Sequence, residues 1–305
     1  MTQDINNIVF KKAQEILTFL MNQLFLTNND KIIYHYTSPA GLEGILKNKV
    51  LWFTRSDYLN DSTEMNYIFD SLDKALDENK YAKEFCEHIR NKFIKNNIDF
   101  HCLNYLDDYY ICSFSKAEDE LNMWNYYSKT ESKAGYNISF KTFDLINSVN
   151  GLSNNYGFDI GDVIYGDEVQ TKVWNPALEH LNKLYLENID SCKNENSEEL
   201  NSIDNVLIDI LLIHAPFIKH PAFKNEAELR IVYRVLKHKD EEINIREQNG
   251  IFIPYHEVPF QKEIVQSVMI SPYVKSYNKV KSMQLLLDKY GYDCKVNTSS
   301  IPIRY

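Results

Sequence analysis

Glycine is scarce in this chain, with nine residues in a length of 305. Neither the glycine-rich fingerprint of a dinucleotide-binding βαβ unit nor a phosphate-binding P-loop occurs, although both need glycines at fixed spacings. The nucleophile elbow of α/β-hydrolases and the two-histidine zinc helix of metalloproteases are missing as well. These absences argue against the commonest nucleotide-binding and hydrolase classes.

Cysteine is also sparse, with five residues spread over the chain. None lies in a Cys-x-x-Cys pair or a Cys/His cluster, so the sequence indicates neither a disulfide framework nor a metal site. The N-terminal segment carries Asp4, Lys11, Lys12 and Glu15, which interrupt the apolar core that a signal peptide needs. We therefore expect a cytoplasmic protein without a metal cofactor.

Long hydrophobic runs and excess positive charge are missing too. The most apolar stretch, residues 206–218, is interrupted by Asp209, His214 and Pro216 and is shorter than the roughly 20 residues that cross a bilayer. The net charge of −10 argues against a broad basic surface for nucleic acid, and leaves room for a local basic pocket. We expect no membrane partner.

The composition that remains is that of a globular protein, with 44% hydrophobic and 25% charged residues. Apolar residues at three- and four-residue steps predict helices over residues 6–26, 63–78, 81–94 and 277–290. Apolar and alternating runs predict strands over residues 32–36, 50–54, 109–114, 135–140, 159–166, 227–235, 251–255, 264–270 and 294–297. The pattern predicts the α+β class.

Domain organisation follows from length and from the distribution of polar stretches. We expect a single domain over residues 1–305, with an N-terminal helix over about 4–27 and a helical insertion over about 171–218. Trp124 and Tyr127 lie three apart on a further predicted helix. They could form the wall of a ligand pocket, but aromatics at helical spacing are more often core, which we favour for Trp124.

One early segment, residues 31–65, combines a strand, a capped helix, a second strand and a polar loop. His35 lies on the strand face opposite Tyr34 and Tyr36, because side chains alternate. Ser38 and Pro39 are typical of a helix start. After the second strand come Arg55, Ser56, Asp57, Asn60 and Asp61. So many polar groups need partners if they are buried, so the segment predicts a polar cleft.

A late strand carries charge on one face. Glu226, Glu228 and Arg230 share that face if the strand begins at Glu226. The alternative to a functional site is an exposed strand face with an internal salt bridge. Lys219, just upstream, adds a positive charge that could meet a phosphate.

Several motifs resemble one bacterial family. Y-H-Y-T, G-L-x-G-I-L, L-W-F-T and Y-L-N-D-S-x-E follow one another in the early segment. W-N-Y-Y, K-H-P-A-F, E-A-E-L-R and S-I-P-I-R follow later in the chain. In this order they resemble the family known as domain of unknown function 2971, over roughly residues 31–305.

A more distant resemblance, by order alone, is to the ADP-ribosyltransferase superfamily, which includes RNA phosphotransferases and DNA-modifying toxins. A strand bearing His35, an L-x-x-I-L helix, a second strand and a glutamate on a late strand carry it. The resemblance implies a central split or strongly bent mixed sheet flanked by helices, and NAD as substrate. It also implies an acceptor that is a nucleic acid or a protein, in a bacterial toxin or phage defence context.

The same resemblance implies roles for individual residues. Glu228 would be the catalytic carboxylate, with Glu226 as the second candidate. Cleavage of the nicotinamide bond passes through an oxocarbenium-like state that a fixed carboxylate stabilises. His35 would donate to a ribose hydroxyl. An aromatic ring would stack on nicotinamide, and an arginine would face the diphosphate. The implied cofactor-binding set is His35, Tyr36, Thr37, Arg55, Tyr58, Asn60, Asp61, Lys219, Arg230 and Arg304.

Two other classes of function stay open. A non-catalytic sensor or defence-system module could bind a nucleotide in the same cleft, and the protein could also act by structural partnering alone. The C-terminal residues are also part of the predicted polar cleft. We expect an ordered tail in which Ile301 and Ile303 point into the core and Arg304 reaches the cleft.

Overall fold

The structure, a computed structural model, has helices and a large mixed sheet, so the chain is an α+β protein. It describes residues 2–25, 31–61, 63–77, 80–96, 99–103, 107–127, 134–150, 158–236, 243–248 and 250–303. The chain divides into two compact units. The helical unit comprises residues 1–26, 59–107 and 162–221, and the sheet unit comprises residues 27–58, 108–161 and 222–305. The expectation of a single domain stays a prediction, because a division by contacts does not say whether the units fold separately.

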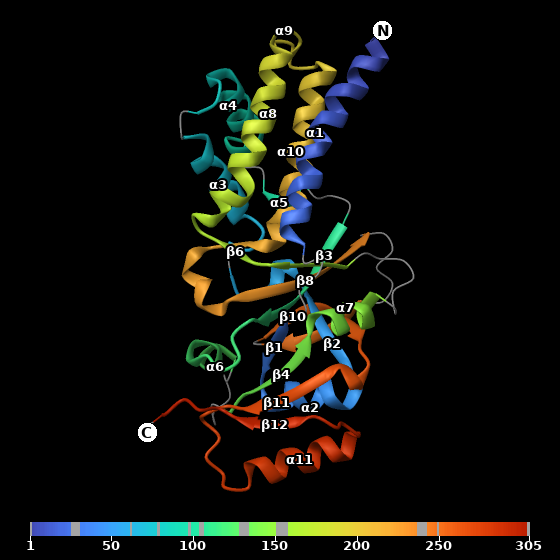
Figure 1. Cartoon of the computed structure of the whole chain (residues 1–305), viewed down its shortest axis with the longest axis vertical. Helices are drawn as coiled ribbons and strands as arrows, with labels where there is room; N and C mark the ends of the chain where they lie inside the picture. Colours follow the sequence, from blue (N-terminus) through green and yellow to red (C-terminus); the bar gives the residue numbers. More distant parts are fainter. Residues whose placement is uncertain are drawn as a thin grey trace. The chain divides into compact units, whose positions relative to one another are not determined.

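The helical unit is built around three long helices, α1 (Thr2–Leu24), α8 (Asn175–Glu187) and α10 (Glu198–His214). They lie side by side in Figure 1, and each contacts the other two. The remaining elements are α3 (Tyr67–Leu76), α4 (Lys83–Ile89), α5 (Phe100–Leu103), α9 (Ile189–Cys192), the π-turns η2 (Arg90–Ile94) and η3 (Gln170–Trp174), η4 (Ala215–Phe217), and the paired strands β6 (Ile164–Tyr165) and β7 (Ile218–Lys219). The helices predicted over residues 6–26, 63–78 and 81–94 are therefore confirmed, as is the helical character of residues 171–218.

Helix α10 is the most apolar element of the helical unit. The segment Glu198–Phe217 is long and apolar enough to cross a membrane by length and composition alone. However, 61% of its most apolar 18-residue window is buried, and α10 packs against both α1 and α8. This burial is the behaviour of a core helix, because its apolar side chains already have protein partners.

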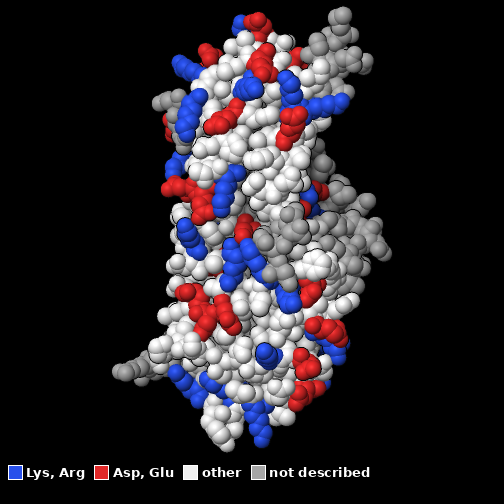
Figure 2. Space-filling model, viewed as in Figure 1, with Lys and Arg blue, Asp and Glu red and all other residues white. Residues whose placement is uncertain are grey.

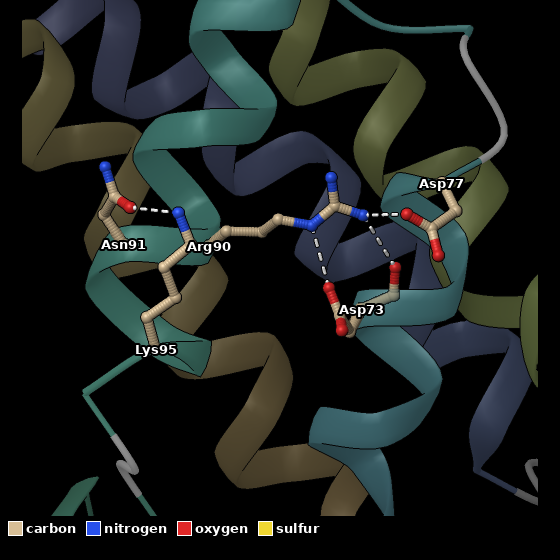
Figure 3. Close-up of polar contacts among 5 residues, drawn as sticks. All are labelled: Asp73, Asp77, Arg90, Asn91 and Lys95. Carbon is tan, nitrogen blue, oxygen red and sulfur yellow. Dashed lines mark hydrogen bonds and ion pairs between the residues drawn. The ribbon is translucent and has the colours of Figure 1, made fainter.

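Arg90 ties α4 and η2 to helix α3 (Figure 3). Its Nε donates to Asp73 Oδ1 at 2.8 Å, and its Nη2 bonds to Asp77 Oδ1 and to the Asp73 carbonyl. On the following turn, Lys95 Nζ donates to Asn91 Oδ1 at 2.9 Å. The hydrogen bond to Asp73 raises the pKa of Arg90, because the carboxylate favours the charged guanidinium.

Ten strands of the described chain form one mixed sheet in the sheet unit. Their bounds are β1 (Ile32–Thr37), β2 (Val50–Arg55), β3 (Asp107–Ser115), β4 (Tyr136–Lys141), β5 (Phe158–Asp162), β8 (Glu228–Leu236), β9 (Asn244–Gln248), β10 (Ile251–Pro259), β11 (Val265–Ile270) and β12 (Lys295–Thr298). The order is β12-β11-β4-β1-β3-β2-β10-β9, and β8 pairs with both β3 and β5. Strand β3 therefore has three neighbours, β1, β2 and β8, and the sheet branches there.

The strand register divides the sheet into two faces. Tyr34 is paired with Ser139 and Ser115, and Tyr36 with Asn137, so these residues share what we call the polar face. His35 is paired with Ile138 on the opposite, apolar face. The predicted separation of His35 from Tyr34 and Tyr36 is thus confirmed.

Helices flank the sheet within its own unit. They are α2 (Pro39–Asn48), α6 (Leu121–Tyr127), α7 (Thr142–Asn150) and α11 (Lys279–Tyr290). Helix α6 contacts β1, and Trp124 and Met123 form a buried cluster with Tyr34, Tyr36 and Met269. Trp124 is fully buried, so its prediction as a core residue is confirmed.

Candidate functional site

Glu228 and Arg230 begin strand β8 and form an ion pair inside the sheet unit. Arg230 Nε donates to Glu228 Oε1 at 2.7 Å, and Arg230 Nη2 donates to Glu228 Oε2 at 3.2 Å. Glu228 is 3% exposed and Arg230 is 1% exposed. The internal salt bridge expected from the sequence is present. The strand face that carries it is buried, not exposed.

Glu226 departs from the expected alternation. It is the last residue of the 3-10 helix η5 (Pro221–Glu226), and β8 begins at Glu228. Between them, Ala227 has φ +44°, which costs a residue with a Cβ atom about 1–2 kcal/mol. The direction of the Glu226 side chain is therefore set by this bend and not by strand alternation.

The end of β3 holds this bend in place. Ser115 Oγ donates to the Glu226 carbonyl at 2.7 Å, and Lys116 N donates to the Ala227 carbonyl at 2.9 Å. Ala227 N donates to the Lys224 carbonyl at 3.1 Å. These three hydrogen bonds stabilise the strained backbone at Ala227. Ala227 therefore links two buried carboxyl groups, since Glu226 is buried as well as Glu228.

His35 lies against the apolar face. Its Nδ1 is 3.0 Å from the Ser113 carbonyl, to which it can donate as the neutral Nδ1–H tautomer, and its ring lies 5.5 Å from that of Phe114. Burial lowers the pKa of His35, so the imidazole is neutral at pH 7. The role of His35 toward a ribose stays a prediction.

Tyr36 and Thr37 support their surroundings. The Tyr36 hydroxyl lies 2.9 Å and 2.8 Å from the carbonyls of Ala117 and Glu118, either of which can accept its one proton, and its ring packs edge-on against Trp124. Burial raises the pKa of Tyr36. Thr37 Oγ1 occupies the space that a Cβ atom at Gly41 would need. Tyr36 thus contacts the backbone of residues 117–118, and Thr37 packs against Gly41 of α2. Their expected contact with a cofactor stays a prediction.

Arg55 is the last residue of β2, and Tyr58 ends the 3-10 helix η1 (Ser56–Tyr58) that follows it. The Arg55 guanidinium donates to both oxygens of Asp57 at 2.8 Å and 2.7 Å, and lies 4.0 Å from Asp108. Asp57 raises the pKa of Arg55. The guanidinium also lies over the Tyr58 ring, 5.5 Å from its centroid. A diphosphate at Arg55 would therefore compete with two carboxylates.

Asn60, Asp61 and Lys219 belong to the helical unit. Asp61 Oδ1 accepts hydrogen bonds from Thr63 N at 2.8 Å and Thr63 Oγ1 at 2.7 Å. Asp61 Oδ2 is buried and has no partner among the described residues. Lys219 is buried on β7. Whether these residues share one cleft with His35 and Glu228 stays a prediction, and Arg304 lies outside the described residues.

One polar cluster was missed by the sequence analysis. Arg246, on β9, donates from Nη2 to Thr54 Oγ1 at 2.9 Å, and its guanidinium carbon lies 5.2 Å from the Trp52 ring centroid and 5.4 Å from that of Tyr255. We call Arg246, Trp52, Thr54 and Tyr255 the Arg246 cluster. Strand β9 reads N-I-R-E-Q, which lacks an apolar alternation, so its arginine resembled an ordinary surface charge.

Metal binding and thiol chemistry find little support in the part of the chain that the structure describes. Within it, no group of three His, Cys, Asp or Glu side chains could hold a metal ion. Cys86, Cys112, Cys192 and Cys294 are free thiols. Burial raises the pKa of Cys192 and of Cys294 to about 11, which makes them poor nucleophiles at pH 7.

Acidic and basic side chains are interspersed over the face in view in Figure 2, and neither sign covers it. The chain has no significant match among curated proteins. A family model described as "Protein of unknown function (DUF2971)" matches residues 123–231. The match contains Glu226, Glu228 and Arg230 but is shorter than the expected span, so the resemblance outside it stays a prediction. Residues 123–231 of this chain are thus similar to that family.

Proposed function

We propose that the protein is an NAD-consuming transferase of the ADP-ribosyltransferase type, in which Glu228 is the catalytic carboxylate. The observation that carries the proposal is the bidentate Glu228–Arg230 pair buried at the start of β8. Buried ion pairs contribute little stability compared with apolar residues of the same size. An ion pair with this desolvation cost is more easily explained by chemistry than by folding.

The charges of the site suit this reaction. The start of β8 and the residue before its bend supply two carboxyl groups, Glu226 and Glu228, and one guanidinium, Arg230. When the ribose–nicotinamide bond breaks, the bonding electrons leave with neutral nicotinamide and positive charge develops on the ribose. A carboxylate that Arg230 holds in one orientation stabilises that charge before a nucleophile on the acceptor attacks the same carbon.

A nucleotide-binding module without catalysis is the second candidate. The specific observation in its favour is that both oxygens of Glu228 already accept hydrogen bonds from Arg230. Such a carboxylate is better suited to setting the shape of a site than to accepting a proton. In both candidates the small-molecule partner is a nucleotide.

Nicotinamide release by the purified protein tests the first candidate. We expect Glu228→Gln to lower the release rate about 100-fold or more, because removing one electrostatic contact to a transition state costs 10²–10³ in rate. Glu43→Gln is the matched control, since Glu43 is exposed on α2. Circular dichroism checks the fold, because Glu228→Gln leaves the Arg230 charge buried without its counter-ion.

The result also separates the two candidates. Equal release by wild type and Glu228→Gln would contradict the catalytic role. Absence of release with any nucleic-acid or protein acceptor, together with a rise in melting temperature on adding NAD or ADP-ribose that Glu228→Gln abolishes, would favour the binding module. Absence of both signals would contradict both candidates.

A further inference from the structure

Arg246 differs from the other described arginines in its partners. Arg55, Arg90, Arg230 and Arg234 each form an ion pair with a carboxylate. Arg246 has no carboxylate within 4.0 Å among the residues that the structure describes. Its one hydrogen bond to a described residue goes to the neutral hydroxyl of Thr54.

The surroundings of Arg246 make this arrangement costly. Burial lowers the pKa of Arg246, which means that the charged form loses hydration. Its Nε atom is buried without an acceptor among the described residues. The rings of Trp52 and Tyr255 offset part of this cost through cation–π contacts. An apolar side chain would fill the same space over the two rings without any desolvation cost.

The geometry is suited to an anion that also carries an aromatic ring. Thr54 Oγ1 bonds Nη2 and orients the planar guanidinium, whose other N–H groups match the oxygens of a phosphate. The Trp52 ring centroid lies 4.6 Å from that of Tyr255, and the residue Trp52 is 42% exposed. An exposed indole beside an oriented guanidinium presents a stacking surface and a phosphate contact to the same small molecule.

We propose that the Arg246 cluster is a binding site for a nucleoside monophosphate, with the phosphate on Arg246 and the base stacked on Trp52. This site uses β2, β9 and β10 of the sheet unit and contains neither Glu226 nor Glu228. It does not depend on the transferase activity. A protein without NAD turnover could still bind a nucleotide here.

Tryptophan fluorescence provides the test on the full chain. Trp124 and Trp174 are fully buried, so Trp52 is the exposed reporter. Adenosine 5′-monophosphate, adenosine and inorganic phosphate are titrated separately, and calorimetry gives the dissociation constants. We expect saturable quenching by the monophosphate, with adenosine and phosphate each binding at least about tenfold more weakly, since each lacks one of the two contacts.

Variants distinguish binding from packing. Arg246→Met should weaken monophosphate binding at least about tenfold while leaving the melting temperature unchanged or higher, because it removes a desolvated charge. Arg234→Met is the matched control. It removes a half-exposed arginine of the same unit that pairs with Asp159, and should leave the affinity unchanged. Glu228→Gln should also leave it unchanged, which separates this site from the proposed catalytic site.

Three results would overturn the proposal. They are equal monophosphate affinity in wild type and Arg246→Met, absence of saturable binding of all three probes, and binding that Arg234→Met weakens as much as Arg246→Met. A lower melting temperature of Arg246→Met without any change in binding would instead assign Arg246 a packing role.

Discussion

His214 is a titratable residue that the helical unit holds neutral. It is 1% exposed at the end of α10, and its Nδ1 lies 3.0 Å from the Ile210 carbonyl. Burial lowers the pKa of His214 from 6.5 to about 4. The unfolded chain therefore binds this proton more tightly than the folded chain does.

This shift predicts a loss of stability in acid. The contribution of His214 is fully present above pH 6.5 and is lost as the pH falls from 6.5 toward 4, with a total of about 3 kcal/mol. We expect His214→Gln to flatten the fall in the free energy of unfolding over this range, measured by urea titration at pH 7 and pH 5. His180→Gln, at a partly exposed histidine of α8, is the control. An unchanged pH dependence in His214→Gln would contradict the prediction.

Helix α2 shows how local signals define an element. Ser38 Oγ accepts a hydrogen bond from Gly41 N at 3.1 Å and Pro39 is the first helical residue, as the sequence predicted. The other end has a left-handed C-cap at Lys49, with φ 57° and a hydrogen bond from Lys49 N to the Ile45 carbonyl at 2.8 Å. A lysine at this position carries the strain that glycine avoids.

Lys49→Gly should therefore stabilise the protein. Removing the Cβ atom relieves the left-handed strain, and the free energy of unfolding should rise by about 0.5–1 kcal/mol. Lys47→Gly is the matched control, because Lys47 is exposed within the last turn of the same helix, where glycine costs about 1 kcal/mol. Chemical denaturation of both variants checks the prediction. Destabilisation by Lys49→Gly would show that the cap is not strained.

At the scale of the whole chain, the two ends belong to different units. The N-terminal helix lies in the helical unit, and residues 300–303 belong to the sheet unit. Ser300 N donates to Asp119 Oδ2 at 2.8 Å, and Asp119 Oδ1 accepts from Trp124 Nε1 at 2.7 Å. Ile301 packs against the cluster of Tyr34, Tyr36, Met123, Trp124 and Met269. The inward position expected for Ile301 is confirmed.

Deleting residues 300–305 should lower stability. The lost apolar contact of Ile301 and the lost hydrogen bonds of Ser300 together contribute about 2 kcal/mol, which corresponds to a fall in melting temperature of roughly 4–8 °C. Deleting residues 304–305 alone is the control and isolates Arg304. If the longer deletion left the melting temperature unchanged, the tail would be dispensable. If the shorter one left nucleotide binding unchanged, Arg304 would have no role in the site.

The sequence by itself determined most helices and strands, because capping and apolar periodicity are local properties. The helix start at Ser38, the strand that carries His35 and the core position of Trp124 all follow from residues within a few positions of one another. The Glu228–Arg230 pair was also predictable, since residues two apart on a strand share a face.

The tertiary structure decided what depends on distant segments. Burial of the Glu228–Arg230 face, the bend at Ala227 and the branching of the sheet at β3 all require strands that are far apart in the sequence. The Arg246 cluster joins β9 to β2 across almost 200 positions, and its strand has no apolar period of its own. The neighbours of such residues depend on which strands pair, and the residue pattern within one segment does not predict its pairing partner.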